Sequence, residues 1–145
     1  MGRIKIDVDT SPIFTTSVKV RIGDINYGNH VGNDAFVSMI NEARMQWLAS
    51  KGFNELEIEG TGLIMSDLAV EFKQECFYGE IIEIVLSAGE ISKVSFEIFY
   101  LIQTTRAGEM VLLAKAKTGM VSYNYQEKKV SPIPSTLRMM LTSEL

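Results

Sequence analysis

The strongest constraint on the fold of this chain is that only one long segment has helical periodicity. Over residues 34–50, apolar side chains recur at a spacing of three or four, which places them on one face of a helix. Asn33 or Asp34 can cap the start of this helix, and Gly52 can end it. The apolar face consists of Phe36, Met39, Ile40, Ala43 and Trp47.

Around this helix, apolar and polar side chains alternate with the period of half-buried strands. Gly89-Glu90 and Ala107-Gly108 suit the turns of hairpins. Pro132 and Pro134 stop the last strand, and a short helix is predicted from there to Leu141. The predicted strands cover residues 13–21 before the long helix and 63–72, 80–88, 94–102 and 110–122 after it.

One helix followed by four consecutive hairpin-linked strands predicts the α+β class, with an antiparallel sheet and the helix packed on one of its faces. The length of 145 residues fits a single domain that covers residues 1–145. A sheet of this kind has exposed edges, and pairing with a second copy of the chain is the expected way to cover them.

Composition and charge exclude several classes of function. The net charge of −4 argues against general binding to nucleic acid or to acidic membranes. Residues 1–10 contain no apolar core of a signal peptide, and no apolar stretch approaches the length of a membrane span. The single cysteine, Cys76, rules out an intrachain disulfide, so a cytoplasmic location is expected.

Few catalytic arrangements are compatible with the residues present. With one histidine, His30, and one cysteine, the chain cannot assemble a zinc site from these ligands, and no metal is expected. Nucleophile-elbow, phosphate-loop and dinucleotide-binding motifs are absent from the sequence. A Cys76–His30 dyad stays open, although a lone cysteine is commonly a small buried apolar residue.

A dense polar cluster precedes the long helix. A helix start offers unpaired N–H groups and the positive end of the helix dipole, which suit a developing oxyanion. Carboxylate, imidazole and amide groups lie within a few residues of it, so a bound carbonyl could be attacked there. The alternative is that these residues serve only as turn and capping material. The cluster contains Asp24, Asn26, Tyr27, Asn29, His30, Asn33 and Asp34.

The order of these residues resembles a known pattern. Residues 21–33 read RIGDINYGNHVGN, and Glu42-Ala43-Arg44 follows on the helix. This resembles the signature of hotdog-fold acyl-CoA thioesterases of the 4-hydroxybenzoyl-CoA thioesterase type, over about residues 13–140. The resemblance implies a hotdog fold, an antiparallel sheet wrapped around one long central helix. Asn29 and Gly32 depart from the usual pattern, in which Gly and Asn are more familiar at these two positions.

The resemblance also implies roles for single residues. Asp24 is expected to be the nucleophile or general base, His30 to orient the substrate carbonyl or the loop, and the Val31 N–H to bind the thioester oxygen. Asn26, Tyr27 and Asn33 are expected to bind substrate. The implied reaction is hydrolysis of an acyl-CoA or other acyl thioester without a cofactor. Active sites would lie at the interface of a homodimer, which could assemble further into a homotetramer.

Two other functions compete with this one. Hydratases and dehydratases of the same fold act on enoyl or hydroxyacyl thioesters and carry an Asp-x-Asn-Pro-x-His motif. Asp24 and Asn26 fit that motif, but the proline is missing and His30 falls one residue late. The third function is a non-catalytic acyl-CoA binder. The sequence leaves open the acyl group, the choice between CoA and a carrier protein, and the choice between nucleophile and general base for Asp24.

Overall fold

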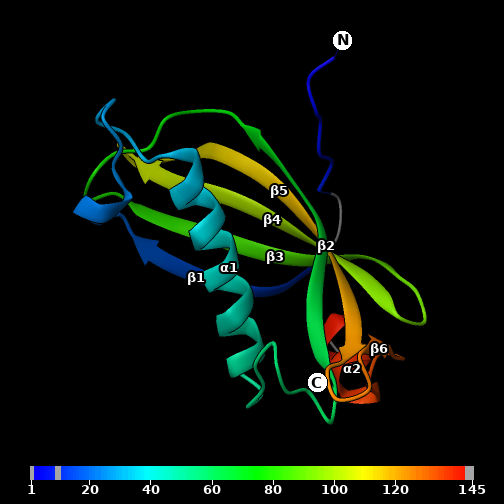
Figure 1. The fold of residues 1–145 in the computed structure, drawn as a ribbon. Helices are drawn as coiled ribbons and strands as arrows, with labels where there is room; N and C mark the ends of the chain where they lie inside the picture. The colour runs from blue at the N-terminus through cyan, green and yellow to red at the C-terminus, as the bar shows by residue number, and fades with distance from the viewer. Residues whose placement is uncertain (1, 9–10, 143–145) are drawn as a thin grey trace.

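The computed structural model describes residues 2–8 and 11–142 of the chain. Residues 1, 9–10 and 143–145 lie outside the described residues. The predicted domain, residues 1–145, and the sequence pattern of residues 1–10 both include some of these positions. Within the described residues, one antiparallel sheet packs against one long helix, α1, which lies across a single face of the sheet (Figure 1). The predicted α+β class and hotdog architecture are confirmed.

The sheet has six strands, with the order β1-β3-β4-β5-β2 and β6 paired to β5. All pairings are antiparallel. A short 3-10 helix, η1 (Ile22–Asp24), precedes α1, and α2 closes the described chain. The bounds are β1 Pro12–Lys19, α1 Asn33–Ala49, β2 Gly62–Phe72, β3 Ile81–Ile91, β4 Ser95–Arg106, β5 Glu109–Asn124, β6 Lys129–Val130 and α2 Ser135–Leu141.

The apolar face of α1 forms the centre of the core, as its spacing predicted. Its five predicted side chains, from Phe36 to Trp47, are all at most 4% exposed. They pack against the alternate inward side chains of the strands, such as Ile84, Ile98 and Ala116, which are fully buried. Each large apolar side chain buried in this way contributes about 1.5–3 kcal/mol. This packing fixes the start of α1 relative to the sheet.

Two predicted connections differ from the structure. β2 is not linked to β3 by a hairpin, since β2 pairs with β5 at the far edge and the link at residues 73–80 crosses the sheet. Gly89-Glu90 lies inside β3, where a Cβ on Gly89 would come within 2.5 Å of the Phe99 ring. The glycine there allows close packing, and the turn follows later, with the Ser92 N–H donating to the Ser95 carbonyl at 2.8 Å. The turn predicted at Ala107-Gly108 is confirmed by positive φ values of 51° and 79°.

Arg44 breaks the predicted pattern of α1, because it belongs to the polar residues of the helix and yet is only 2% exposed. Its guanidinium donates to Glu55, to Asn41 Oδ1 at 2.8 Å and to the buried Tyr100 hydroxyl at 3.1 Å. The hydroxyl in turn lies 2.7 Å from Thr118 Oγ1. This network joins α1 to the loop that follows it and to the middle of the sheet.

Among residues 2–8 and 11–142, no helix is both long enough and apolar enough to cross a membrane.

Candidate functional site

The polar cluster before α1 folds into a tight hairpin-like turn. Ile25 and Val31 form an isolated antiparallel bridge. Inside it, the Asn26 N–H donates to the His30 carbonyl at 3.0 Å, and the Asn29 N–H donates to the Asn26 carbonyl at 3.1 Å. Asn29 has a φ of 66°, a conformation that asparagine tolerates better than most residues. This explains why asparagine can stand where glycine is more familiar.

Asp24 is held beside the start of α1 through its backbone. Its carbonyl accepts the N–H of Gly32, the residue that caps α1, at 3.1 Å. Its carboxylate Oδ2 accepts the Arg21 N–H at 2.8 Å, and its side chain is partly exposed. The backbone of the residue predicted to be catalytic is therefore held next to the helix start, while one oxygen of its carboxylate is turned back onto η1.

A cavity of about 450 Å³ opens at this helix start. Four of the six predicted site residues line it, namely Asn26, His30, Val31 and Asn33. Asp24 does not line it, and Tyr27 is fully exposed outside it. The remaining wall comes from Phe36, Phe72, Lys73, Gln74 and Glu75.

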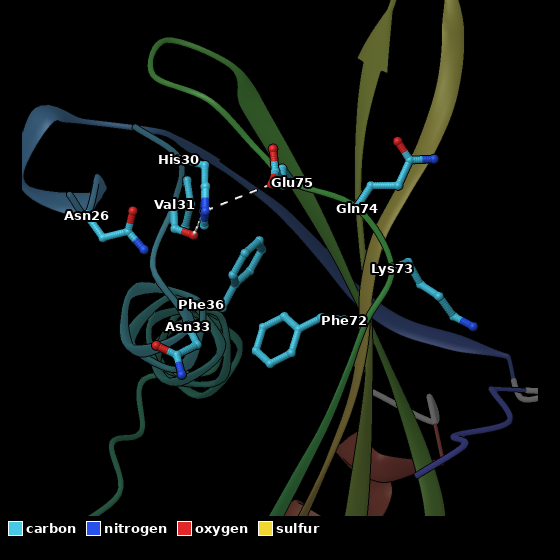
Figure 2. A pocket seen from close by; sticks show the side chains of 9 residues that line it. All are labelled: Asn26, His30, Val31, Asn33, Phe36, Phe72, Lys73, Gln74 and Glu75. Atoms are coloured by element: carbon cyan, nitrogen blue, oxygen red, sulfur yellow. Dashed lines mark hydrogen bonds and ion pairs between the residues drawn. The ribbon is translucent and has the colours of Figure 1, made fainter. Parts of the chain in front are cut away.

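Two aromatic rings form the apolar wall of this cavity. Phe36 of α1 and Phe72 of β2 meet edge to face, with ring centroids 5.6 Å apart (Figure 2). Phe72 is 40% exposed and also lines a neighbouring groove of about 230 Å³ with Val37 and Val70. Phe72 therefore separates the cavity from an apolar groove that runs between α1 and β2.

Sequence reasoning assigned no role to Glu75 itself, which supplies the only carboxylate among the described residues that line this cavity. Its Oε1 lies 4.0 Å from His30 Nε2, and Figure 2 shows the two side chains directed toward one another. Lys73 points away from Phe36 and pairs with Glu71 at 2.7 Å. No motif places Glu75 at the site, because it reaches the turn only through the crossing of residues 73–80.

The donors at the helix start are not all available to a ligand. The Val31 N–H, expected to bind the thioester oxygen, donates to the Cys76 carbonyl at 2.8 Å, so that this bond would have to open first. Within the described part of the chain, no hydrogen bond uses the N–H of Asn33 or of Ala35. Asn33 also lines the cavity, so its N–H is a second candidate for the donor that binds the thioester oxygen.

Cys76 is a structural residue in this conformation. It is fully buried, and burial raises the pKa of its thiol to about 12, so a reactive thiolate is not formed at neutral pH. Over the two described ranges of the chain, no group of three His, Cys, Asp or Glu side chains is placed to hold a metal ion.

The segment that carries Glu75 is fixed by an ion pair. Arg106 donates to both carboxylate oxygens of Glu80, at 2.6 and 2.7 Å, and to the Glu75 carbonyl at 2.7 Å. The Arg106 guanidinium lowers the pKa of Glu80 to about 2. The pKa of Glu80 in the folded protein lies below its unfolded value of about 4.5. The ion pair therefore stabilises the fold at pH values above about 4.5. The stabilisation is lost as the pH falls toward 2.

Replacing Arg106 with glutamine should therefore lower the free energy of unfolding at pH 7 by on the order of 2 kcal/mol, since the Glu80 carboxylate loses its cation. The loss should shrink between about pH 5 and pH 2, where the wild type loses the same interaction. Urea unfolding across this pH range measures it. Lys129→Gln, which removes an exposed cation that pairs with Glu127, serves as the control. If the free energies of unfolding of Arg106→Gln and wild type ran parallel across this pH range, the stabilising role of the Arg106–Glu80 pair would be refuted.

Comparisons with known proteins agree with this fold. A 1,4-dihydroxy-2-naphthoyl-CoA thioesterase from Synechocystis is 23% identical, with a TM-score of 0.79 over 89% of this chain and 95% of its own. A mutant 4-hydroxybenzoyl-CoA thioesterase in complex with 4-hydroxybenzoyl-CoA is 17% identical, with a TM-score of 0.79 over 88% and 97%. The gentisyl-coenzyme A thioesterase BH1999 is 22% identical, with a TM-score of 0.75 over 88% and 99%. At these identities the likeness shows the fold.

The sequence itself gives the family. Among curated proteins none matches the chain. Residues 20–141, which include the whole site and most of the sheet, match the model of the thioesterase-like superfamily. The resemblance carried by the motif before α1 is thereby confirmed, and so is the predicted enzyme class: the chain belongs to the thioesterase-like superfamily.

Proposed function

We propose that this protein hydrolyses an acyl-CoA thioester to the free acid and CoA, with Asp24 as the catalytic carboxylate. The observation that carries the proposal is the placement of the Asp24 backbone against Gly32, at the helix start that opens into the cavity. The three similar structures support the substrate class, since all three are CoA thioesterases. No cofactor is needed for this reaction, and a cytoplasmic location is part of the same proposal.

The chemistry follows from the groups at the helix start. A thioester carbonyl in the cavity would direct its oxygen at the Asn33 N–H, where the helix dipole favours negative charge. Val31 could add a second N–H if its bond to the Cys76 carbonyl opened. Asp24 would then act on the carbonyl carbon, and Asn26 and His30 in the cavity wall would orient the substrate. Tyr27 lies outside the cavity, so its proposed contact is with a part of the substrate that extends beyond it.

A second copy of the chain would complete the surroundings of this site. β2 is an edge strand with apolar side chains that are 37–40% exposed, namely Ile64, Leu68 and Phe72. We infer that two copies form a homodimer through this edge, because unpaired strand edges with apolar side chains favour pairing. Light scattering after gel filtration should give twice the monomer mass of 16.2 kDa or a multiple of it. A monomer at micromolar concentration would contradict this inference.

Crotonyl-CoA separates the proposed reaction from hydration, because it is both a thioester and an enoyl compound. A thioesterase converts it to crotonate and free CoA, whereas a hydratase converts it to 3-hydroxybutyryl-CoA and releases no thiol. Mass spectrometry of the products distinguishes the two. Hydrated acyl-CoA as the enzyme-dependent product would replace the proposal with the hydratase function.

Phe72 should limit the size of the acyl group that the cavity accepts. Removal of its ring in Phe72→Ala would join the cavity to the groove lined by Val37 and Val70. We expect kcat/KM to rise for longer acyl groups and to fall for those that pack against the ring, by about tenfold each way, since one lost apolar contact is worth about 1–3 kcal/mol. Competition between short and long acyl-CoAs measures the ratio of their kcat/KM values. Phe77→Ala, outside the cavity lining, is the control, and an unchanged ratio in Phe72→Ala would exclude Phe72 as the limit.

A further inference from the structure

The side chains of His30 and Glu75 form a pair whose geometry the proposed role of Asp24 does not use. His30 Nδ1 lies 3.1 Å from the Val31 carbonyl oxygen. A carbonyl only accepts hydrogen bonds, so Nδ1 must carry the proton there. In the neutral imidazole, Nε2 is then an acceptor, and it faces Glu75 Oε1, a second acceptor.

The distance between these two acceptors fits one water molecule. At 4.0 Å, Nε2 and Oε1 are too far apart for a direct hydrogen bond. Two hydrogen bonds of about 2.8 Å drawn from one oxygen to both acceptors meet at roughly 90°, close to the angle between the O–H bonds of water. A water that donates to both acceptors must turn its lone pairs away from them.

The backbone segments that carry the two acceptors are held in place by hydrogen bonds. The Lys73 and Gln74 N–H groups donate to the Leu113 carbonyl at 2.8 and 3.2 Å. On the other side of Glu75, its own carbonyl accepts from Arg106, and the Cys76 carbonyl accepts from the Val31 N–H next to His30. The two acceptors thus belong to segments that are directly joined, and both side chains line the cavity.

We propose that His30 and Glu75 bind the hydrolytic water of the reaction and direct its lone pairs at the acyl carbon, which leaves Asp24 as the nucleophile. This inference rests on the proposed function. It adds a site for the water and decides between the two roles that the sequence leaves open for Asp24. His30 can take the proton of the water, so Asp24 is not needed as its base.

The two steps balance as follows. A carboxylate oxygen of Asp24 bonds to the acyl carbon, the C–S bond breaks, and the electron pair leaves with the CoA thiolate, which takes a proton from solvent. The water oxygen then bonds to the acyl carbon, the bond to Asp24 breaks, and its electron pair returns to the carboxylate. One proton of the water passes to His30 Nε2 and from there to solvent.

Loss of Glu75 should slow the second step alone. In Glu75→Ala, rapid mixing with the best acyl-CoA should release about one thiol per site in a burst, followed by turnover slower than wild type by on the order of 10²-fold. Glu75→Gln keeps an oxygen acceptor and should recover part of the rate. Glu109→Ala removes an exposed carboxylate at the start of β5, and should behave as wild type.

A second readout does not depend on activity. Because His30 is the only histidine, one imidazole spin system appears in ¹⁵N NMR spectra of the whole protein. The neutral ring should carry its proton on Nδ1, and a proton on Nε2 would overturn the water site. An unchanged rate in Glu75→Ala, or a slower rate without a burst, would also overturn it while the thioesterase function stands. A wild type that releases no thiol would remove the proposed function and this inference together.

Discussion

The Asp24→Ala protein is expected to lose at least about 10³-fold in kcat for thioester hydrolysis while it keeps its fold and its assembly state. The carboxylate is partly exposed, and its one described hydrogen bond to protein holds η1 rather than the core. Its removal should therefore cost little stability. The backbone contact between Asp24 and Gly32 does not depend on the side chain and should persist.

Steady-state thiol release by wild type and variant measures this loss, with circular dichroism and light scattering to confirm the fold and the assembly. Asp67→Ala is a matched control, because this carboxylate contacts Lys117 and the Gly119 N–H, away from the cavity. If Asp24→Ala kept more than about a tenth of the wild-type kcat, Asp24 would have no place in the chemistry.

The largest expected effect on stability comes from the buried network around Arg44. Arg44→Ala removes the cation that links Glu55 to the Tyr100 hydroxyl and leaves space in the core. Breaking a buried pair in this way costs about 3–5 kcal/mol. For a chain of this length, that corresponds to a fall in Tm of about 10 °C.

Thermal and urea unfolding of Arg44→Ala measure this cost. Tyr100→Phe removes the two hydrogen bonds that this hydroxyl makes, with Arg44 and with Thr118, and should cost about 1–3 kcal/mol. Lys51→Ala, an exposed cation just after α1, should be close to neutral. A cost below about 1 kcal/mol for Arg44→Ala would mean that the network does not hold the helix to the sheet.

Local patterns of the sequence predicted the fold well where one face of an element is buried. The spacing from Phe36 to Trp47 defines a helix face, and this face covers the apolar face of the sheet. Alternation defined the strands for the same reason. Neither pattern contains information on which strand lies beside which, so the position of β2 next to β5 was missed. Arg44 was missed because its charge suggests exposure, and its partners lie on the following loop and on β4.

The candidate site was predicted only in the part that is contiguous in sequence. His30 and Val31 lie in one turn and Asn33 begins the helix directly after it, so a motif could identify them together. Glu75 and Phe72 reach the cavity from the end of β2 and the segment that follows. Their position depends on the chain crossing of residues 73–80, which no local pattern reveals. That the Val31 N–H is already hydrogen-bonded could not be predicted for the same reason, because its partner is the Cys76 carbonyl on that segment.

The most direct test of the central proposal is thiol release by the wild-type protein, followed with a disulfide dye. The panel runs from acetyl-CoA to palmitoyl-CoA and includes benzoyl-CoA and phenylacetyl-CoA. Release with at least one acyl group, at a kcat/KM within the range of enzymes of about 10⁴–10⁸ M⁻¹s⁻¹, is the predicted result. Release from none of these thioesters above the rate without protein would contradict the assignment as an acyl-CoA thioesterase.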